Sequence, residues 1–183
     1  LQREQFKNLI ECLEPELPLI YIDESGFQSD ETRSHSYSHK GTRAEGCFNW
    51  QAKNSCNAIG ALIKNKLLTV SLFNCSITTE VFEGWIEHDL LPKLKQRSVL
   101  ILDNATFHKG KRLKELLQKA GHYLVWLPKY SPDLNPIEKM WAQVKSVRRK
   151  FRVKNIDILF RDLCSDLFRI WLYKSPDIAK LRI

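Results

Sequence analysis

Short apolar runs alternate with longer amphipathic stretches along most of the chain. Apolar runs of about four to eight residues, bounded by turn residues, are typical of buried strands. Two of these runs are separated by the polar turn Lys64–Lys66 and therefore favour a hairpin. The five predicted strands are Leu19–Ile22, Asn57–Ile63, Leu67–Phe73, Val99–Leu102 and Tyr123–Leu127.

Helices are predicted where apolar residues recur at helical spacing. Thr79 can cap a helix that runs to about Leu91, and Gly121 closes one that begins near Lys111. Asn135 is expected to cap a further helix with Pro136 in its first turn. The expected core face of that helix is Ile137, Trp141, Val144 and Phe151, and the remaining predicted helices span 4–13 and 156–173.

The order of these elements predicts an α/β fold, because an early hairpin precedes strand–helix alternation. We expect a mixed sheet with helices on both faces. Two of the apolar strands each end in an aspartate, Asp23 and Asp103, and are expected to be parallel neighbours. Since ligands gather at the carboxyl ends of strands in open α/β sheets, both aspartates should lie at a functional edge.

Composition favours a globular cytoplasmic protein. The chain has 183 residues, enough for one domain with a sizeable core. No apolar run reaches the ~18 residues that cross a bilayer, and the first residues lack the apolar region of a secretory signal. The five cysteines form no C-x-x-C pair, so we interpret them as reduced thiols, mostly in the core.

The distribution of charge indicates a class of partner. Net charge is +8, and residues 139–154 hold seven bases and no acid. A basic stripe of this kind is typical of proteins that bind a polyanion such as DNA. Taken alone, the same stripe could equally be a solvated helix face.

Three acidic positions supply candidate chemistry: Asp23, Asp103 and Glu138, the last in the first turn of its helix. Converging carboxylates repel one another and stay ionised together only with cations between them. Magnesium prefers oxygen ligands, and two ions about 3.5–4 Å apart can activate a hydroxyl and stabilise a leaving 3′ oxygen. Lys145 and Arg149 share a helical face with Glu138 and would hold a phosphate backbone beside the metals.

Each of these signals is weak by itself. A lone aspartate at a strand end is more often a loop or cap residue, and Asn135-Pro136 before a helix is often only a cap and a first-turn residue. The segment from Pro128 to Pro136 could be a plain rigid loop, and His108 alone is more often a surface residue. Only their combination favours a metal-dependent site for nucleic acid.

Four motifs occur together. They are D-E-S-G-F at Asp23–Phe27, Y-x-x-K-G-x-R from Tyr37 to Arg43, D-N-x-x-x-H at Asp103–His108, and P-x-Y-S-P-D-L-N-P-I-E-x-x-W at Pro128–Trp141. Asp103 and Glu138 are separated by 34 residues. In these motifs the chain resembles the DDE transposases of the mariner superfamily, most closely their bacterial insertion-sequence branch. The resemblance covers roughly residues 19–150.

The resemblance implies a ribonuclease-H-like fold around a mixed five-stranded sheet. It implies DNA cleavage with two Mg²⁺ or Mn²⁺ ions and joining to target DNA, commonly at a TA dinucleotide. Asp23, Asp103 and Glu138 would be the catalytic metal ligands. A homodimer is expected in the working complex, because two DNA ends must be brought together. The expected supporting residues are Glu24, Asn104, His108 and Asn135, and the expected DNA contacts are Lys40, Arg43, Lys129, Lys139, Lys145, Arg148 and Arg149.

The helix-turn-helix domains that precede the catalytic domain in that family have no counterpart here. We therefore expect residues 1–18 to lead in from a missing DNA-binding region, 19–155 to form the catalytic domain, and 156–183 to form a helix for packing or protomer contact. Two other functions stay open: a domesticated copy that only binds DNA, and a ribonuclease-H-like nuclease that cuts without joining. An active copy would work in the bacterial cytoplasm, on the nucleoid when bound to DNA.

Overall fold

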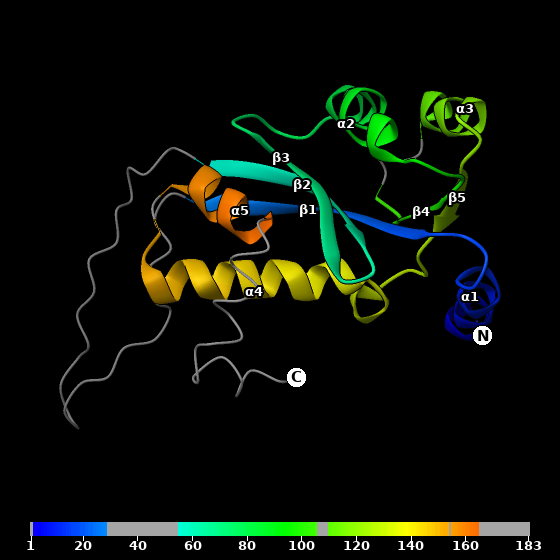
Figure 1. The fold of residues 1–183 in the computed structure, drawn as a ribbon, viewed down its shortest axis with the longest axis horizontal. Coiled ribbons are helices and arrows are strands. Elements are labelled where there is room, and N and C mark those ends of the chain that lie inside the picture. Colours follow the sequence, from blue (N-terminus) through cyan, green and yellow to red (C-terminus); the bar gives the residue numbers. More distant parts are fainter. Residues whose placement is uncertain (1, 29–54, 106–109, 154, 165–183) are drawn as a thin grey trace. The chain divides into compact units, whose positions relative to one another are not determined.

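A five-stranded sheet with the strand order β3-β2-β1-β4-β5 organises the computed structural model (Figure 1). The structure describes residues 2–28, 55–105, 110–153 and 155–164. The strands are β1 (Leu19–Gln28), β2 (Ser55–Ile63), β3 (Lys66–Phe73), β4 (Val99–Leu102) and β5 (Tyr123–Trp126). The α-helices are α1 (Gln2–Leu13), α2 (Thr79–Trp85), α3 (Lys111–Lys119), α4 (Pro136–Phe151) and α5 (Ile156–Cys164).

Strand pairing makes the sheet mixed, as the sequence predicts. β1 pairs with β4 in parallel, with Leu19 beside Val99 and Tyr21 beside Ile101. β4 pairs with β5 in parallel, and β2 pairs with β3 antiparallel. The predicted hairpin is confirmed, and its turn residues Lys64 and Asn65 both have positive φ, which suits a tight hairpin turn.

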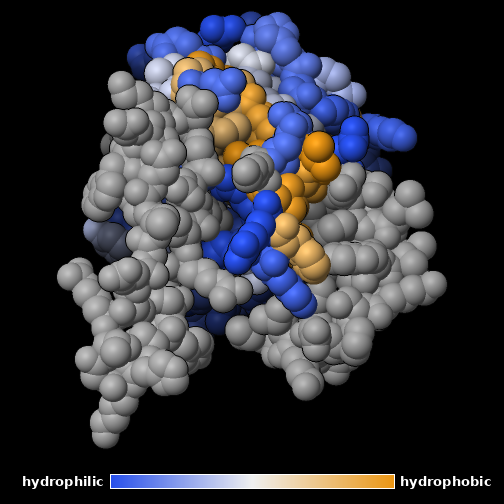
Figure 2. Space-filling view, turned by 90° about the vertical axis from the view of Figure 1, so that its left-hand side faces the viewer, coloured by the Kyte–Doolittle hydropathy of each residue, from blue (hydrophilic) through white to orange (hydrophobic). Residues whose placement is uncertain are grey.

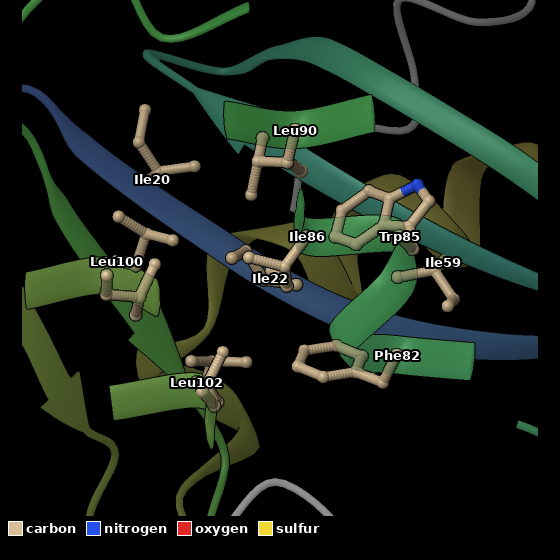
Figure 3. Packing of buried hydrophobic residues seen from close by; sticks show 12 residues of the cluster. Ile20, Ile22, Ile59, Phe82, Trp85, Ile86, Leu90, Leu100 and Leu102 are labelled. Carbon is tan, nitrogen blue, oxygen red and sulfur yellow. The ribbon is translucent and has the colours of Figure 1, made fainter. Parts of the chain in front are cut away.

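Alternating side chains of β1 and β4 supply two separate cores, because successive residues of a strand point to opposite faces. On one face, Ile20 and Leu102 belong to a cluster completed by α2, α3 and the π-helical turn η1 (Ile86–Leu90), and its residues are drawn in Figure 3. On the other face, Leu19 and Ile101 pack with Phe6 of α1. Helices therefore cover both faces of the sheet, as expected.

The chain divides into two compact units. The first comprises residues 1–27 and 56–141, and the second comprises 28–55 and 142–183. The first unit holds nearly all of the sheet, α1 to α3 and the first turns of α4, whereas the second holds the rest of α4 and α5. All three acidic candidate residues belong to the first unit.

Several sequence-based expectations need correction. The cap of α2 is Thr78, not Thr79, and the helix expected to run to Leu91 becomes η1 and then the 3-10 turn η2 (Leu91–Lys93); Pro92 has no N–H to continue the α-helical pattern. Phe151, which was expected in the core face of α4, is 42% exposed, and it lies in the last turn of that helix. The C-terminal helix is described only to Cys164, and its predicted extension to Tyr173 lies outside the described residues.

The surface of the described residues is mainly polar. Figure 2 shows one face on which hydrophilic residues predominate and hydrophobic ones lie between them. Within the described ranges, no helix is both long and apolar enough to cross a membrane.

The cysteines also need a correction. Cys12 and Cys75 are exposed and Cys56 is partly so, which contradicts the expectation that the thiols lie mostly in the core for these three. Cys12 lies on α1, whose buried residue is Phe6, and Cys75 follows the end of β3.

Candidate active site

Two neighbouring strands carry the first two carboxylates to one edge of the sheet. Asp23 follows Tyr21 by two residues on β1, and Asp103 follows Ile101 by two residues just after β4. Tyr21 and Ile101 are partners across the parallel pair, so continuing the register brings Asp103 beside Asp23. Two-residue periodicity also gives both aspartates the same face of the sheet. The predicted juxtaposition of strand-end aspartates is thereby explained by the pairing.

The third carboxylate is supplied by the start of α4. A 3-10 turn, η4 (Pro132–Leu134), leads to Asn135, whose extended backbone (φ −107°, ψ 98°) precedes the helix. The Glu138 N–H donates to the Asn135 carbonyl at 3.1 Å. The Asn135 side-chain oxygen is buried and has no hydrogen-bond partner, so the predicted side-chain cap is wrong. The first turn of α4 is instead held by the backbone hydrogen bond from Glu138 to Asn135 and by the packing of Ile137 and Trp141 against the sheet.

Close contact with the sheet fixes the first two turns of α4. Ile137 is fully buried and Trp141 is 2% exposed, on either side of exposed Glu138. A Cβ atom built on Gly60 of β2 would lie 2.6 Å from Cη2 of Trp141, so only glycine leaves room for the indole. The Trp141 ring also meets the Phe27 ring edge-on at 6.3 Å. This packing sets the height of α4, and therefore of Glu138, above the sheet.

A pocket of about 420 Å³ contains all three carboxylates. Its size falls in the range of small-molecule sites, ~300–1,000 Å³. Asn104, Asn135 and Lys129 line it too, whereas Glu24 does not. The full lining is Asp23, Asp103, Asn104, Leu127, Pro128, Lys129, Tyr130, Ser131, Pro132, Asn135 and Glu138.

The carboxyl group of Asp23 is strongly perturbed by its surroundings in the pocket. Burial, followed by the negative charges of Glu138, Glu24 and Asp103, raises its pKa to about 8 despite a backbone hydrogen bond. Its side chain is buried, and Oδ2 has no hydrogen-bond partner. A buried carboxylate oxygen without a donor is costly unless a proton or a cation neutralises it.

The donor set fits a hard divalent cation. All three candidate ligands are carboxylates, which Mg²⁺ and Mn²⁺ accept, and the partnerless Oδ2 of Asp23 leaves a lone pair for such an ion. Among the described residues, no group of three or more His, Cys, Asp or Glu side chains is already drawn together tightly enough to hold a metal.

Hydrogen bonds tie the loop between β5 and α4 to its surroundings. The Asn104 amide donates to the Leu127 carbonyl at 2.5 Å, and Asp103 Oδ1 accepts from the Ala105 N–H at 2.9 Å. On the far side of the loop, Arg3 of α1 donates to Ser131 Oγ at 3.0 Å and forms an ion pair with Asp133. Sequence reasoning missed Arg3, because no local pattern links α1 to this loop.

The expected DNA contacts, and the expected supporting residue His108, lie in different parts of the chain. Lys129 lines the pocket, and Lys139 is exposed in the first turns of α4. Arg148 is only 4% exposed and its Nε donates to the Val153 carbonyl at 3.3 Å, so its prediction as a surface contact is wrong. It follows Val144 by four residues and shares the buried stripe of the helix. Lys145 and Arg149 lie on the part of α4 in the second unit, and Lys40, Arg43 and His108 lie outside the described residues.

Comparison with known proteins identifies the family to which this chain belongs. A family model described as DDE superfamily endonuclease matches residues 18–159, including all three carboxylates. The chain belongs to this superfamily. Among curated proteins, the transposable element Tcb2 transposase of Caenorhabditis briggsae is 32% identical to this DDE chain over 87 residues. The alignment covers 45% of this chain and 32% of that relative, so the match is to about a third of the nematode protein.

Solved structures show that the DDE chain has a transposase fold. The Mos1 transposase paired-end complex with left transposon end gives a TM-score of 0.69 at 14% identity, covering 97% of this chain and 55% of that one. The catalytic domain of Mos1 mariner transposase gives 0.59 at 11% identity, covering 97% and 81%. The expected ribonuclease-H-like fold is confirmed by the likeness to the Mos1 catalytic domain, and membership of the DDE superfamily is confirmed by the family model. The nematode relative gives no support for the bacterial insertion-sequence branch.

Proposed function

We propose that this chain is the catalytic part of a DNA transposase, which cuts strands at the ends of a mobile element and joins them to target DNA. The observation that carries this proposal is one pocket that contains Asp23, Asp103 and Glu138, at the carboxyl ends of two parallel strands. The family match places the same three residues within a DDE endonuclease domain. Hydrolysis without joining is the alternative that the test below must separate.

Asp23, Asp103 and Glu138 would hold two Mg²⁺ or Mn²⁺ ions. Bound there, such ions supply Lewis-acid chemistry for an in-line displacement at phosphorus. Asp23 contributes its buried, partnerless oxygen, and Glu138 contributes a carboxylate on a helix whose position is fixed by Trp141. Asn104 holds the Leu127 carbonyl and so keeps the loop on its side of the pocket. We propose that Glu24, which is next to Asp23 in the chain, and His108 support the site.

The phosphate chemistry is the same in cutting and in joining. An oxygen of water, or of a 3′-hydroxyl, forms a bond to phosphorus while the bond from phosphorus to the leaving 3′ oxygen breaks. The attacking oxygen loses a proton to solvent, and the leaving oxygen gains one. Lys129, exposed at the pocket, adds a positive charge for the phosphate oxygens.

We also propose the narrower features that the motifs imply. The spacing of 34 residues between Asp103 and Glu138 supports the bacterial insertion-sequence branch, and with it a bacterial cytoplasmic location. A TA-containing target and a homodimeric working complex follow from the same resemblance. DNA contacts at Lys40, Arg43, Lys139, Lys145 and Arg149 complete the proposal.

Mn²⁺-dependent nicking and strand transfer test this function directly. Asp23→Asn, Asp103→Asn and Glu138→Gln should each abolish nicking, and combining them should cost little more, because residues that act as a unit are non-additive. All three should still bind DNA and melt cooperatively. The matched control is Glu115→Gln, which removes an exposed carboxylate of α3 outside the pocket; it should nick at the parent rate.

Each outcome assigns one function. Products joined to a second DNA molecule support a transposase, whereas cut products alone support a nuclease. Binding without cutting by the parent chain supports a domesticated DNA-binding protein. If Asp103→Asn or Glu138→Gln nicks at near the parent rate, the three-carboxylate mechanism is wrong.

A further inference from the structure

Tyr130 has an unusual position at the mouth of the pocket. Its side chain is 96% exposed, the highest value among the large hydrophobic residues that the structure describes as exposed. It lines the same pocket as Asp23, Asp103 and Glu138. The ring therefore contributes little to the packing of the protein, although it lies at the site where a phosphate would react.

The backbone conformation at position 130 does not favour a tyrosine there, so folding alone does not explain why this residue is a tyrosine. Its φ is +54°, in the left-handed region that glycine adopts without cost and a side chain makes unfavourable. Lys64 and Asn65 share this feature, but they form a two-residue hairpin turn that requires it. Glycine would adopt the backbone conformation at position 130 at a lower free-energy cost than tyrosine. The exposed ring gains no burial that would offset this cost. The aromatic side chain is thus best explained by something that it contacts outside the protein.

Contacts of neighbouring residues restrict the backbone that carries the Tyr130 ring. Ser131 is 5% exposed; its hydroxyl donates to the Lys129 carbonyl at 3.2 Å and accepts from Arg3 at 3.0 Å. Pro128 and Pro132 lie two residues to either side of Tyr130 and restrict the backbone further. An exposed aromatic ring on such a pinned loop is already arranged for contact, so little conformational entropy is lost when a ligand binds.

We propose that Tyr130 is a stacking site for a nucleobase next to the scissile phosphate. This inference rests on the proposed function, because it takes DNA as the substrate. A phosphate held at the three carboxylates would bring an adjacent base or a terminal base pair to the rim that Tyr130 occupies. Aromatic rings stack on every base, since each presents a π-face, and neighbouring Lys129 supplies charge for the backbone. Tyr130 thereby contributes binding without sequence preference.

Four variants test this assignment: Tyr130→Ala, Tyr130→Phe, Tyr130→Gly and, as a control, Tyr123→Ala. Tyr123 is also an exposed tyrosine, but it lies at the opposite end of β5 from the pocket and has the Arg97 guanidinium 5.6 Å above its ring. DNA with 2-aminopurine at the cleaved end reports stacking by loss of fluorescence. Plasmid nicking and melting temperature are measured on the same proteins.

The parent chain and Tyr130→Phe should quench 2-aminopurine and bind alike, because the ring and not the hydroxyl makes the contact. Tyr130→Ala should bind roughly tenfold more weakly, the order expected for one lost base–aromatic stack, and should lose the quenching. Tyr130→Gly should lose binding equally while melting at or above the parent temperature, since it relieves the left-handed backbone. Tyr123→Ala should match the parent in both DNA assays.

Different failures have different meanings. If Tyr130→Phe loses as much as Tyr130→Ala, a hydroxyl contact replaces stacking and the proposal is overturned. If Tyr130→Ala matches the parent in quenching and affinity while the parent nicks DNA, the stacking site is wrong and the proposed function stands. A folded parent chain that neither binds nor nicks DNA would overturn the proposed function, and this inference with it.

Discussion

The Asp23 carboxyl group lies in an unfavourable place for a negative charge. The side chain is 7% exposed, and one of its oxygens has no hydrogen-bond partner. Burial and the charges of Glu138, Glu24 and Asp103 all raise its pKa. Such a carboxyl group is stable in the folded protein when it holds a proton or faces a cation. Metal-free and metal-bound protein should therefore differ most at this residue.

The melting temperature of metal-free protein should fall as the pH rises from 3.8 toward 8. The pKa of Asp23 is about 8 in the folded protein and near its ordinary 3.8 in the unfolded chain, so the folded state binds the extra proton across this window. The stabilisation by that proton is complete below the unfolded pKa and is lost as the pH rises through the folded pKa. Melting scans in EDTA across this range measure the slope.

Asp23→Asn supplies the comparison for this slope, because an amide cannot ionise. Its melting temperature should depend less on pH than that of the parent, and the two curves should diverge with the variant more stable near pH 8. Adding Mg²⁺ to the parent should also reduce the slope. Parallel curves for parent and variant in EDTA would show that the Asp23 carboxyl is not protonated in the folded protein.

Individual residues differ in how far sequence could predict their roles. Asp23 and Asp103 were predictable because each ends an apolar strand, and such ends meet when strands are parallel. Glu138 was predictable from its motif and its first-turn position. Arg148 was not, since a run of bases does not reveal which one faces inward. Tyr130 stands in the last motif, but its role at the rim could not be predicted, because exposure and a positive φ are properties of the folded loop.

At the level of elements, the contact between α4 and β2 decides where Glu138 lies. Gly60 allows the Trp141 indole to approach the sheet more closely than any side chain at position 60 would permit. Ile137 lies 3.5 Å from the same position, one residue before Glu138. A shift of α4 away from the sheet would move Glu138 relative to the two aspartates, which are held by β1 and β4.

Gly60→Ala should therefore lower both stability and nicking. Its Cβ atom would overlap the indole, and overpacking of a core costs about 1–3 kcal/mol. Nicking should fall more than the loss of folded protein accounts for, because Glu138 moves with the helix. Melting curves and nicking rates at a temperature where the variant is folded separate the two effects.

Gly84→Ala is the matched control for this prediction. A Cβ atom on Gly84 of α2 meets nothing within 4 Å, so alanine should stabilise the helix by about 0.5–1 kcal/mol and leave nicking unchanged. The two glycine variants should shift the melting temperature in opposite directions. Equal nicking by Gly60→Ala and the parent would show that the height of α4 does not control Glu138.

The bounds of some strands were predicted more accurately than those of others. β4 agreed with its predicted bounds and β5 differed by one residue, because short apolar runs between polar turns leave little choice. β1 extends to Gln28, past the end of its apolar run, because the residues after Asp23 still take part in the strand. The closeness of Gly60 to Trp141 could not be read from local pattern, since it joins residues far apart in sequence.

For the whole molecule, the net charge of +8 should govern DNA affinity more than any single contact does. Lys145→Ala and Arg149→Ala should each weaken binding to any DNA sequence and reduce the slope of log Kd against log salt by roughly one unit. Such contacts position a duplex without reading it. Titrations of unrelated duplexes at several salt concentrations measure both effects, and loss confined to one sequence would contradict them.

Arg148→Ala distinguishes a surface cation from a buried one in the same basic run. Its guanidinium is buried and donates to the Val153 carbonyl, so its removal should lower the melting temperature and change the salt slope much less than Arg149→Ala does. A full unit of lost slope without a loss of stability would mean that Arg148 reaches DNA after all.

The pairing of Leu19 with Val99 also has a consequence for how the protein is made. Seventy-nine residues separate these two partners in the sequence, and contacts of such wide separation close late and slowly. During synthesis, Asp23 leaves the ribosome early, but it acquires Asp103 only after β4 emerges, and Glu138 later still. A nascent chain that ends before α4 therefore lacks Glu138, and under the proposed function it could not yet cut DNA.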